Sequence, residues 1–185
     1  MDFTESQNDM NSAFTGGATG VFASGLVWLI AGVVGVTMSN VAAMYALFIG
    51  GMFIVPLSIF FSKLLSATGK LSSKNVLRHL ALETLPVLFG GLLIAFYVAQ
   101  IKIELFFPIM LLAIGARYFA FHTLYAIKEY WLLGALLMVA GVACPVLGLP
   151  FIAGAFAGAV LEIVFALILF RKSKMVLSAA RQQRA

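Results

Sequence analysis

Four ionisable residues lie inside long apolar stretches of this 185-residue chain: Glu83, Arg117, His122 and Glu162. A charged side chain in hydrocarbon is costly, and such residues usually face the protein interior, where they bind ions, carry protons or pair with one another. Carboxylate, guanidinium and imidazole groups together can hold a polar solute or pass a proton. These four residues are therefore the first candidates for a functional site.

The composition indicates that the surrounding stretches span a membrane. Hydrophobic residues make up 63% of the chain and charged residues only 10%, whereas a soluble domain carries about 25% charged residues. The first twelve residues contain acidic side chains but no Lys or Arg, so they lack the basic start of a cleavable signal peptide. We therefore expect the first apolar run to remain in the protein as a transmembrane helix.

Six apolar runs are long enough to cross the hydrocarbon core, which takes roughly 20 helical residues. We predict an all-α, polytopic integral membrane protein, a single membrane domain over residues 1–185 that forms a bundle of six transmembrane helices. The predicted spans are residues 18–38, 41–65, 76–100, 107–127, 131–149 and 150–170, followed by a basic cytoplasmic tail at 171–185.

The Lys and Arg residues predict the orientation of the bundle. Six spans place both termini on one side, and that side holds ten Lys and Arg residues: Lys63, Lys70, Lys74, Arg78, Lys128, Arg171, Lys172, Lys174, Arg181 and Arg184. The other side holds Lys102. Since basic loops stay in the cytoplasm, we expect a bacterial plasma (inner) membrane protein with cytoplasmic N- and C-termini.

The same distribution of charge predicts the partners. The net charge is +5, but the basic residues stand at the ends of apolar runs and form no face for a nucleic-acid duplex. We expect contact with the lipid bilayer, including anionic lipids at the cytoplasmic face, and no nucleic acid. A homo-oligomer is left open.

The helical rise of 1.5 Å per residue sorts the four buried charges by depth. Glu162 and Arg117 lie about 18 Å and about 15 Å below the outer surface, while Glu83 and His122 lie about 10 Å and about 8 Å above the cytoplasmic one. Small residues surround Glu162 on its helix, which predicts that it points into a helix interface. We therefore expect two acid–base pairs, Arg117 with Glu162 and His122 with Glu83.

Two tyrosines share the polar arc of the helix at 107–127 with Arg117 and His122. The candidate substrate or ion site thus consists of Arg117, Glu162, His122, Glu83, Tyr118 and Tyr125. The leading interpretation is a transporter of a small solute or ion, coupled to protons, with Arg117 and Glu162 at mid-membrane and Glu83 and His122 as a relay on the cytoplasmic side.

Each of these residues also has a simpler interpretation. Arg117 and Glu162 could form an ion pair that only fixes helix register. Pro86 fits the first turn of a helix, which would place Glu83 near a helix N-terminus at the lipid head groups. His122 could simply hydrogen-bond a backbone carbonyl.

Two other classes of function remain open. A membrane enzyme acting on a lipid head group could use His79 and Glu83, which share a helix face, with His122 as weak candidates for metal ligands. The chain has no HExxH motif and no phosphate-binding glycine loop, so we expect no cofactor and do not favour an enzyme. The third class is a non-catalytic structural or regulatory membrane protein.

Overall fold

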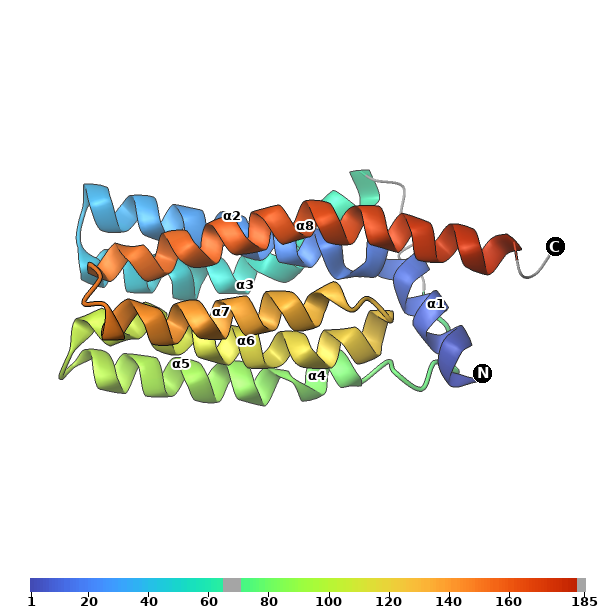
Figure 1. Cartoon of the computed structure of the whole chain (residues 1–185), viewed down its shortest axis with the longest axis horizontal. Coiled ribbons are helices and arrows are strands. Elements are labelled where there is room, and N and C mark those ends of the chain that lie inside the picture. The colour runs from blue at the N-terminus through green and yellow to red at the C-terminus, as the bar shows by residue number, and fades with distance from the viewer. Residues whose placement is uncertain (65–70, 183–185) are drawn as a thin grey trace.

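The computed structural model describes residues 1–64 and 71–182, with side chains described as far as Met175. Leu65 at the end of the second predicted span, the basic residues Lys70 and Arg184, and the side chain of Arg181 lie outside this part. The described chain is mainly helical and has no strand (Figure 1), with the elements α1 (Phe3–Phe14), η1 (Thr15–Gly17), α2 (Ala18–Thr37), α3 (Asn40–Leu64), α4 (Leu80–Glu83), α5 (Leu85–Ala99), η2 (Ile103–Leu105), α6 (Phe106–Tyr125), α7 (Glu129–Val146) and α8 (Phe151–Gln182).

The six predicted spans are confirmed as helices long and apolar enough to cross a membrane. The predicted bounds differ from α2, α3, α6 and α7 by three residues or fewer at the described ends. The third span is divided at Thr84 into the short α4 and α5. Gly148, with a φ of +61°, lies in the turn between α7 and α8, where only glycine adopts this conformation at little cost.

Two regions differ from the prediction. The acidic N-terminal segment, which lies before the first predicted span, forms helix α1, which lies across the end of the bundle where both termini are found (Figure 1). The basic segment from residue 171 is a continuation of α8, which runs unbroken to Gln182. Neither segment is apolar enough to read as a span, which is why the hydropathy pattern did not assign them to a helix.

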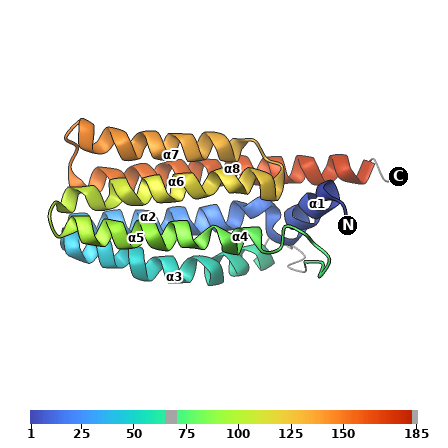
Figure 2. The same cartoon turned by 90° about the horizontal axis from the view of Figure 1, so that it is seen from below.

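The spanning helices form two groups of three. Helix α2 lies between α3 and α8, and α6 lies between α5 and α7, while α8 packs on α7 and α6 and joins the groups (Figures 1 and 2). The connections between α2 and α3, α5 and α6, and α7 and α8 all lie at the end away from the termini (Figure 1). We call this end the distal end and the other the terminal end.

Glycine allows the closest helix contacts. A Cβ added to Gly115 on α6 would lie 2.8 Å from the carbonyl oxygen of Gly134 on α7, so the two backbones touch. A Cβ added to Gly25 on α2 would lie 3.2 Å from the Cβ of Glu162 on α8. Membrane helices associate through such small residues because apolar burial between them yields no gain over lipid. The second of these contacts brings α2 against the central carboxyl group.

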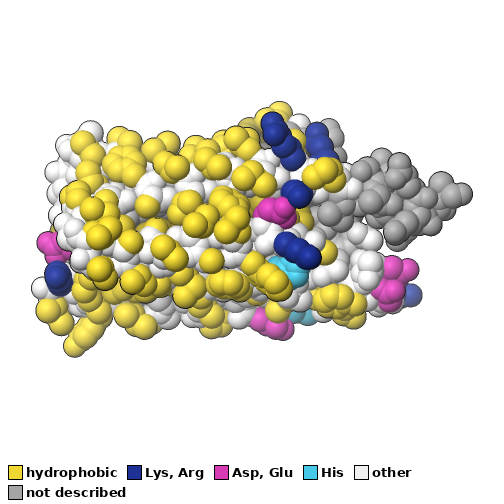
Figure 3. Space-filling model, viewed as in Figure 1, with side chains coloured by type: hydrophobic (Ala, Val, Ile, Leu, Met, Phe, Trp, Pro, Cys, Tyr) yellow, Lys and Arg dark blue, Asp and Glu magenta, His cyan; other side chains and the backbone are white. Residues whose placement is uncertain are grey.

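The outer surface matches a lipid environment. Helices α3 and α5 leave many of their large apolar side chains exposed, and the visible face of the bundle is hydrophobic along most of its length (Figure 3). Charged side chains gather mainly at the terminal end of that face, with a few at the distal end (Figure 3). This distribution is that of a multi-pass membrane protein.

Candidate functional site

Glu162 is the most enclosed charged residue of the described chain. Its exposed fraction is 0%, and it lies between Ala155, Ala159 and Ala166 on the buried face of α8. The short side chains of these alanines let α2 and α6 approach, as the sequence predicted. A carboxyl group thus lies where three helices meet.

The carboxyl group of Glu162 has neutral neighbours. The hydroxyl of Tyr118 on α6 donates to Oε1 over 2.7 Å, and Ser24 on α2 lies beside the same group. Within the described residues, Oε2 has no hydrogen-bond partner. In this part of the chain, one oxygen of a fully buried carboxyl group is therefore without a hydrogen bond of its own, and Ser24 is the neighbouring hydroxyl donor.

A cluster of aromatic rings continues from Tyr118 towards the terminal end. We call Tyr118, Phe121, Tyr125 and Tyr130 the tyrosine cluster, whose neighbouring rings have centroids 5.4–6.0 Å apart. Tyr130 at the start of α7 donates its hydroxyl to the Gly16 carbonyl oxygen at 2.7 Å. Tyr130 is not among the candidate site residues that the sequence singled out, since hydropathy does not show which side a residue at the end of a span faces.

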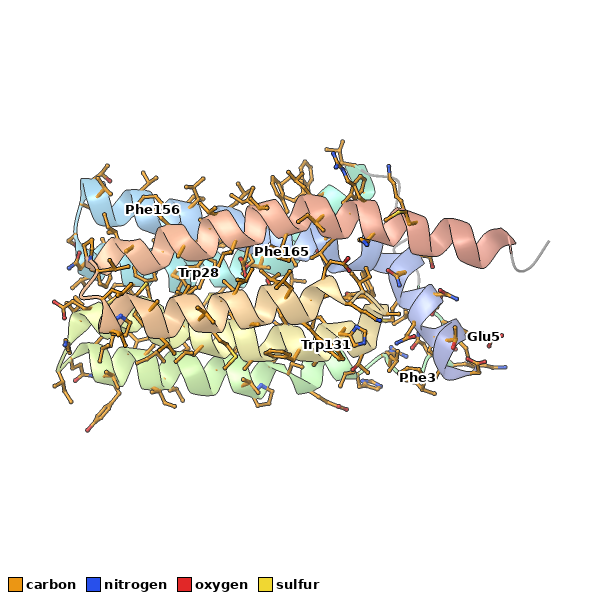
Figure 4. The ribbon with its side chains drawn as sticks, in the orientation of Figure 1. Phe3, Glu5, Trp28, Trp131, Phe156 and Phe165 are labelled. Atoms are coloured by element: carbon orange, nitrogen blue, oxygen red, sulfur yellow. The ribbon has the colours of Figure 1, made fainter. Side chains whose placement is uncertain are left out.

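A second aromatic cluster lies on the distal side of Glu162. The fully buried rings of Trp28, Phe106 and Phe107, together with Phe151, form what we call the distal plug, in which Phe107 lies 4.8 Å from Phe151 and 5.7 Å from Trp28. Figure 4 shows Trp28 in the interior of the bundle. On α8, Gly158 packs against Trp28 one helical turn before Glu162. The carboxyl group is therefore enclosed between the distal plug and the tyrosine cluster.

The predicted pair of Arg117 and Glu162 is not formed. The Nε of Arg117 donates to Thr84 Oγ1 at 2.9 Å, and its guanidinium lies 5.2 Å from the centre of the Phe121 ring. The physical reason is the rotation of about 100° between successive helical residues. Because Tyr118 points towards α8, Arg117 points towards α4 and α5 on another side of α6.

The predicted pair of Glu83 and His122 is also separate. Glu83 is exposed at the end of α4, close to the first turn of α5, where Pro86 stands. His122 packs its ring 4.4 Å from that of Trp131 on α7, and no partner for its buried Nδ1 is found in the described chain. Since α5 and α7 flank α6 on different sides, equal depth did not bring these two residues together.

The metal hypothesis finds no support in the geometry. His79 is exposed next to α4, whereas His122 faces Trp131. In the described ranges, His, Cys, Asp and Glu side chains form no group of three that could hold a metal ion. The polar contacts of the interior are instead hydroxyl and amide contacts, such as the bond of 2.8 Å between Thr19 and Ser62.

Helix α1 closes the terminal end above the tyrosine cluster. Gln7 donates to the carbonyl oxygen of Thr123 at 2.8 Å and Asn11 to that of Tyr125 at 2.6 Å, so two side-chain amides satisfy carbonyls that the end of α6 leaves without helical partners. Asp9 accepts from Asn75 and the backbone of Ser72. Helix α1 is thus hydrogen-bonded both to the end of α6 and to the segment that contains Ser72 and Asn75.

A sequence signal for α1 exists. Asp2 accepts from the backbone of Glu5 while Glu5 accepts from the backbone of Asp2, which is the reciprocal capping box that marks a helix start. The spacing of these two acidic residues is visible in the sequence and predicts a helix start. The interpretation of this segment above rested only on its lack of Lys and Arg.

Residues 3–172 match the model of a protein family that is described as a family of unknown function (DUF7010). The chain belongs to the DUF7010 family. The match begins at Phe3 and ends at Lys172, so α1, the helices from α2 to α7 and the larger part of α8 of this DUF7010 protein fall within it. No curated protein and no solved structure matches the chain.

Proposed function

We propose that this DUF7010 protein transports a small solute or ion across the membrane and that Glu162 couples the transport to a proton. The observation that carries the proposal is the enclosed carboxyl group, which has one oxygen bonded to Tyr118 and the other without a partner in the described chain. Glu162 is on α8 and contacts α2 of the same group of helices and α6 of the other group. A shift between the groups would change its surroundings.

Among the described residues, no Lys, Arg or His is bonded to the carboxyl group of Glu162, which supports a functional role for it. A charged residue at mid-membrane costs at least about 2.5 kcal/mol on insertion scales, and a purely structural acid would offset this cost best by pairing with a base. Arg117 directly precedes Tyr118 on the neighbouring helix α6, but it donates to Thr84 and not to Glu162. A carboxyl group that binds and releases a proton can lose its charge without a counter-ion.

The proposed orientation places both termini in the cytoplasm of a bacterial cell. The basic residues of the terminal end support it, because Lys and Arg are retained on the cytoplasmic side. Lys172 at this end forms an ion pair of 2.9 Å with Glu129, while Lys174 lies 4.4 Å from the centre of the Phe170 ring. Anionic lipids of the inner leaflet are the expected partners of the remaining basic groups.

The test uses purified protein in vesicles that contain a pH-sensitive dye. Amino acids, sugars, nucleosides and inorganic ions are added in turn outside, and the internal pH is followed. We expect at least one of these solutes to drive a pH change that Glu162→Gln abolishes. The matched control is Glu104→Gln, since Glu104 is an exposed acid at the distal end, and this variant should behave like the wild type.

Two results would contradict the proposal. One is a Glu162→Gln protein that folds and moves protons with solute as the wild type does. The other is a wild-type protein for which the whole panel leaves the internal pH unchanged and whose infrared carboxyl band is the same in Glu162→Gln at every pH. The second result would favour the structural role for Glu162.

A further inference from the structure

Different kinds of contact enclose the distal side and the terminal side of Glu162. On the distal side, the rings of Trp28, Phe107 and Phe151 pack on one another without a polar group between them. On the terminal side, the rings of the tyrosine cluster also pack on one another, but they carry hydroxyl groups, and that of Tyr130 donates to the Gly16 carbonyl oxygen. Water can replace a hydrogen bond at little net cost, but it gains nothing from parted aromatic rings. The terminal closure is therefore the one that opens more easily.

The segment that makes this closure has the form of a hinge. Thr15, Gly16 and Gly17 have φ values of 53°, 60° and 76°, so three successive residues adopt the left-handed conformation between α1 and α2. The turn is pressed against the interior: a Cβ at Gly16 would lie 2.8 Å from that of Ser173, and one at Gly17 would overlap the hydroxyl of Tyr130. Two glycines are needed here for both backbone angle and space.

Polar contacts and the buried side chains of Met10 and Ala13 hold the helix beyond the hinge in place. Gln7 and Asn11 donate to the end of α6, and Asp9 accepts from Asn75. All three side chains belong to α1, while their partners belong to other segments. Rotation about the turn would break these bonds together and expose their groups to water, where each finds a new partner.

We infer that α1 and the turn at Thr15–Gly17 form a hinged lid that controls access from the terminal side to Glu162. The inference rests on the proposed function, because Glu162 is the group that the lid serves. The distal plug stays closed while the lid opens. Protons and solute thus enter or leave the central carboxyl group through the terminal end.

Within the described residues, the groups that face Glu162 are two tyrosines, one serine hydroxyl and one cation. Tyr118 on α6 bonds it, and Tyr130 on α7 packs against the Tyr118 ring. From α2 the facing group is the hydroxyl of Ser24, and Arg117 is the cation whose charge reaches it from α6. The lid changes access to this group by movement, and its opening requires none of these side chains to titrate.

The experiment measures access through the reactivity of a single cysteine. Cys144 at the distal end is the chain's single cysteine, so Cys144→Ser with Ser24→Cys places one thiol beside Glu162. Purified protein in detergent is treated with methanethiosulfonate ethylammonium, and the modified fraction is followed by mass spectrometry. The lid variant combines Gln7→Ala and Asn11→Ala. Two lost hydrogen bonds should raise the modification rate on the order of tenfold.

Three further variants make the result decisive. Tyr130→Phe keeps the ring but removes the bond to Gly16, and it should also raise the rate, by about fivefold. Thr4→Ala on the exposed side of α1 should leave the rate unchanged. Phe151→Ala loosens the distal plug and should have less effect than the lid variants. Circular dichroism and size-exclusion chromatography establish that each variant is folded.

Two outcomes would overturn the lid. One is an unchanged rate in both folded lid variants. The other is a rate that rises in Phe151→Ala but not in Tyr130→Phe, which would place the access route at the distal end. Because thiol modification needs no transported solute, a failure of the lid is distinguishable from a failure of the transport proposal, which appears only in the vesicle measurements.

Discussion

The distal half and the terminal half of this bundle exclude water from Glu162 by different means. The distal half packs the wholly apolar rings of Trp28, Phe106 and Phe107 in full burial, whereas the terminal half, whose tyrosine rings are also buried, joins hydroxyl and amide groups to backbone carbonyls, as Tyr130 and Asn11 do. Close packing loses its whole contact energy when it opens, but hydrogen bonds are exchanged with water. With the lid proposed above, the distal end is the fixed end of the bundle and the terminal end its adjustable end.

The largest expected effect comes from breaking the fixed end. Trp28→Ala would leave a cavity beside Gly158 and Phe107, and we expect it to lower the free energy of unfolding by about 3–5 kcal/mol. Thermal unfolding in detergent measures this loss. Trp131→Ala is the control, because Trp131 is 50% exposed near the terminal end (Figure 4). Equal losses in the two variants would show that the distal half has no special stability.

An intermediate effect is expected at the boundary between the halves. Tyr118→Phe removes the donor to Glu162 and leaves a buried acceptor unsatisfied, which should cost about 1–3 kcal/mol. Combined with Glu162→Gln, it should show a coupling energy of about 0.5 kcal/mol or more, measured by unfolding of the single and double variants.

The control for this coupling is Arg117→Leu with Glu162→Gln. Because Arg117 bonds Thr84 and not the carboxyl group, the two changes should add to within about 0.5 kcal/mol. A coupling of Glu162 to Arg117 larger than its coupling to Tyr118 would restore the ion pair that equal depth predicted.

The smallest effect is expected at the adjustable end. Gln7→Ala removes one amide bond to α6 and should leave the global unfolding temperature nearly unchanged. Amide hydrogen exchange in α1 should nevertheless become about fivefold faster, since local opening costs less. Thr4→Ala serves as the comparison in the same helix. Unchanged exchange in Gln7→Ala would mean that α1 is held by its apolar contacts instead.

The sequence was sufficient for the helices because each span must be apolar over about 20 residues, whatever its neighbours are. It was also sufficient for the direction of Glu162, since the small residues on α8 show where another helix comes close. These are properties of one helix at a time. The prediction of an all-helical bundle with six spans succeeded for that reason.

The partners of Arg117 and His122 could not be predicted in the same way. Depth gives one coordinate of a side chain, but a contact also requires the order of the helices around the bundle. Arg117 and Tyr118 have nearly equal depth, yet they face different helices because α6 lies between α5 and α7. The apolar runs contain no information on that order, since every helix of the bundle is equally compatible with lipid.

Helix α8 has one consequence for experimental work. Its 32 residues correspond to a rod of about 48 Å, whereas the hydrocarbon core is about 30 Å thick. The helix that carries the central carboxyl group is therefore about 18 Å longer than the hydrocarbon core requires, without a break. A globular protein fused to it in helical register would be held at a fixed angle to the bundle. Such a fusion would give this small, otherwise featureless membrane protein the mass and the alignment mark needed for imaging by cryo-electron microscopy.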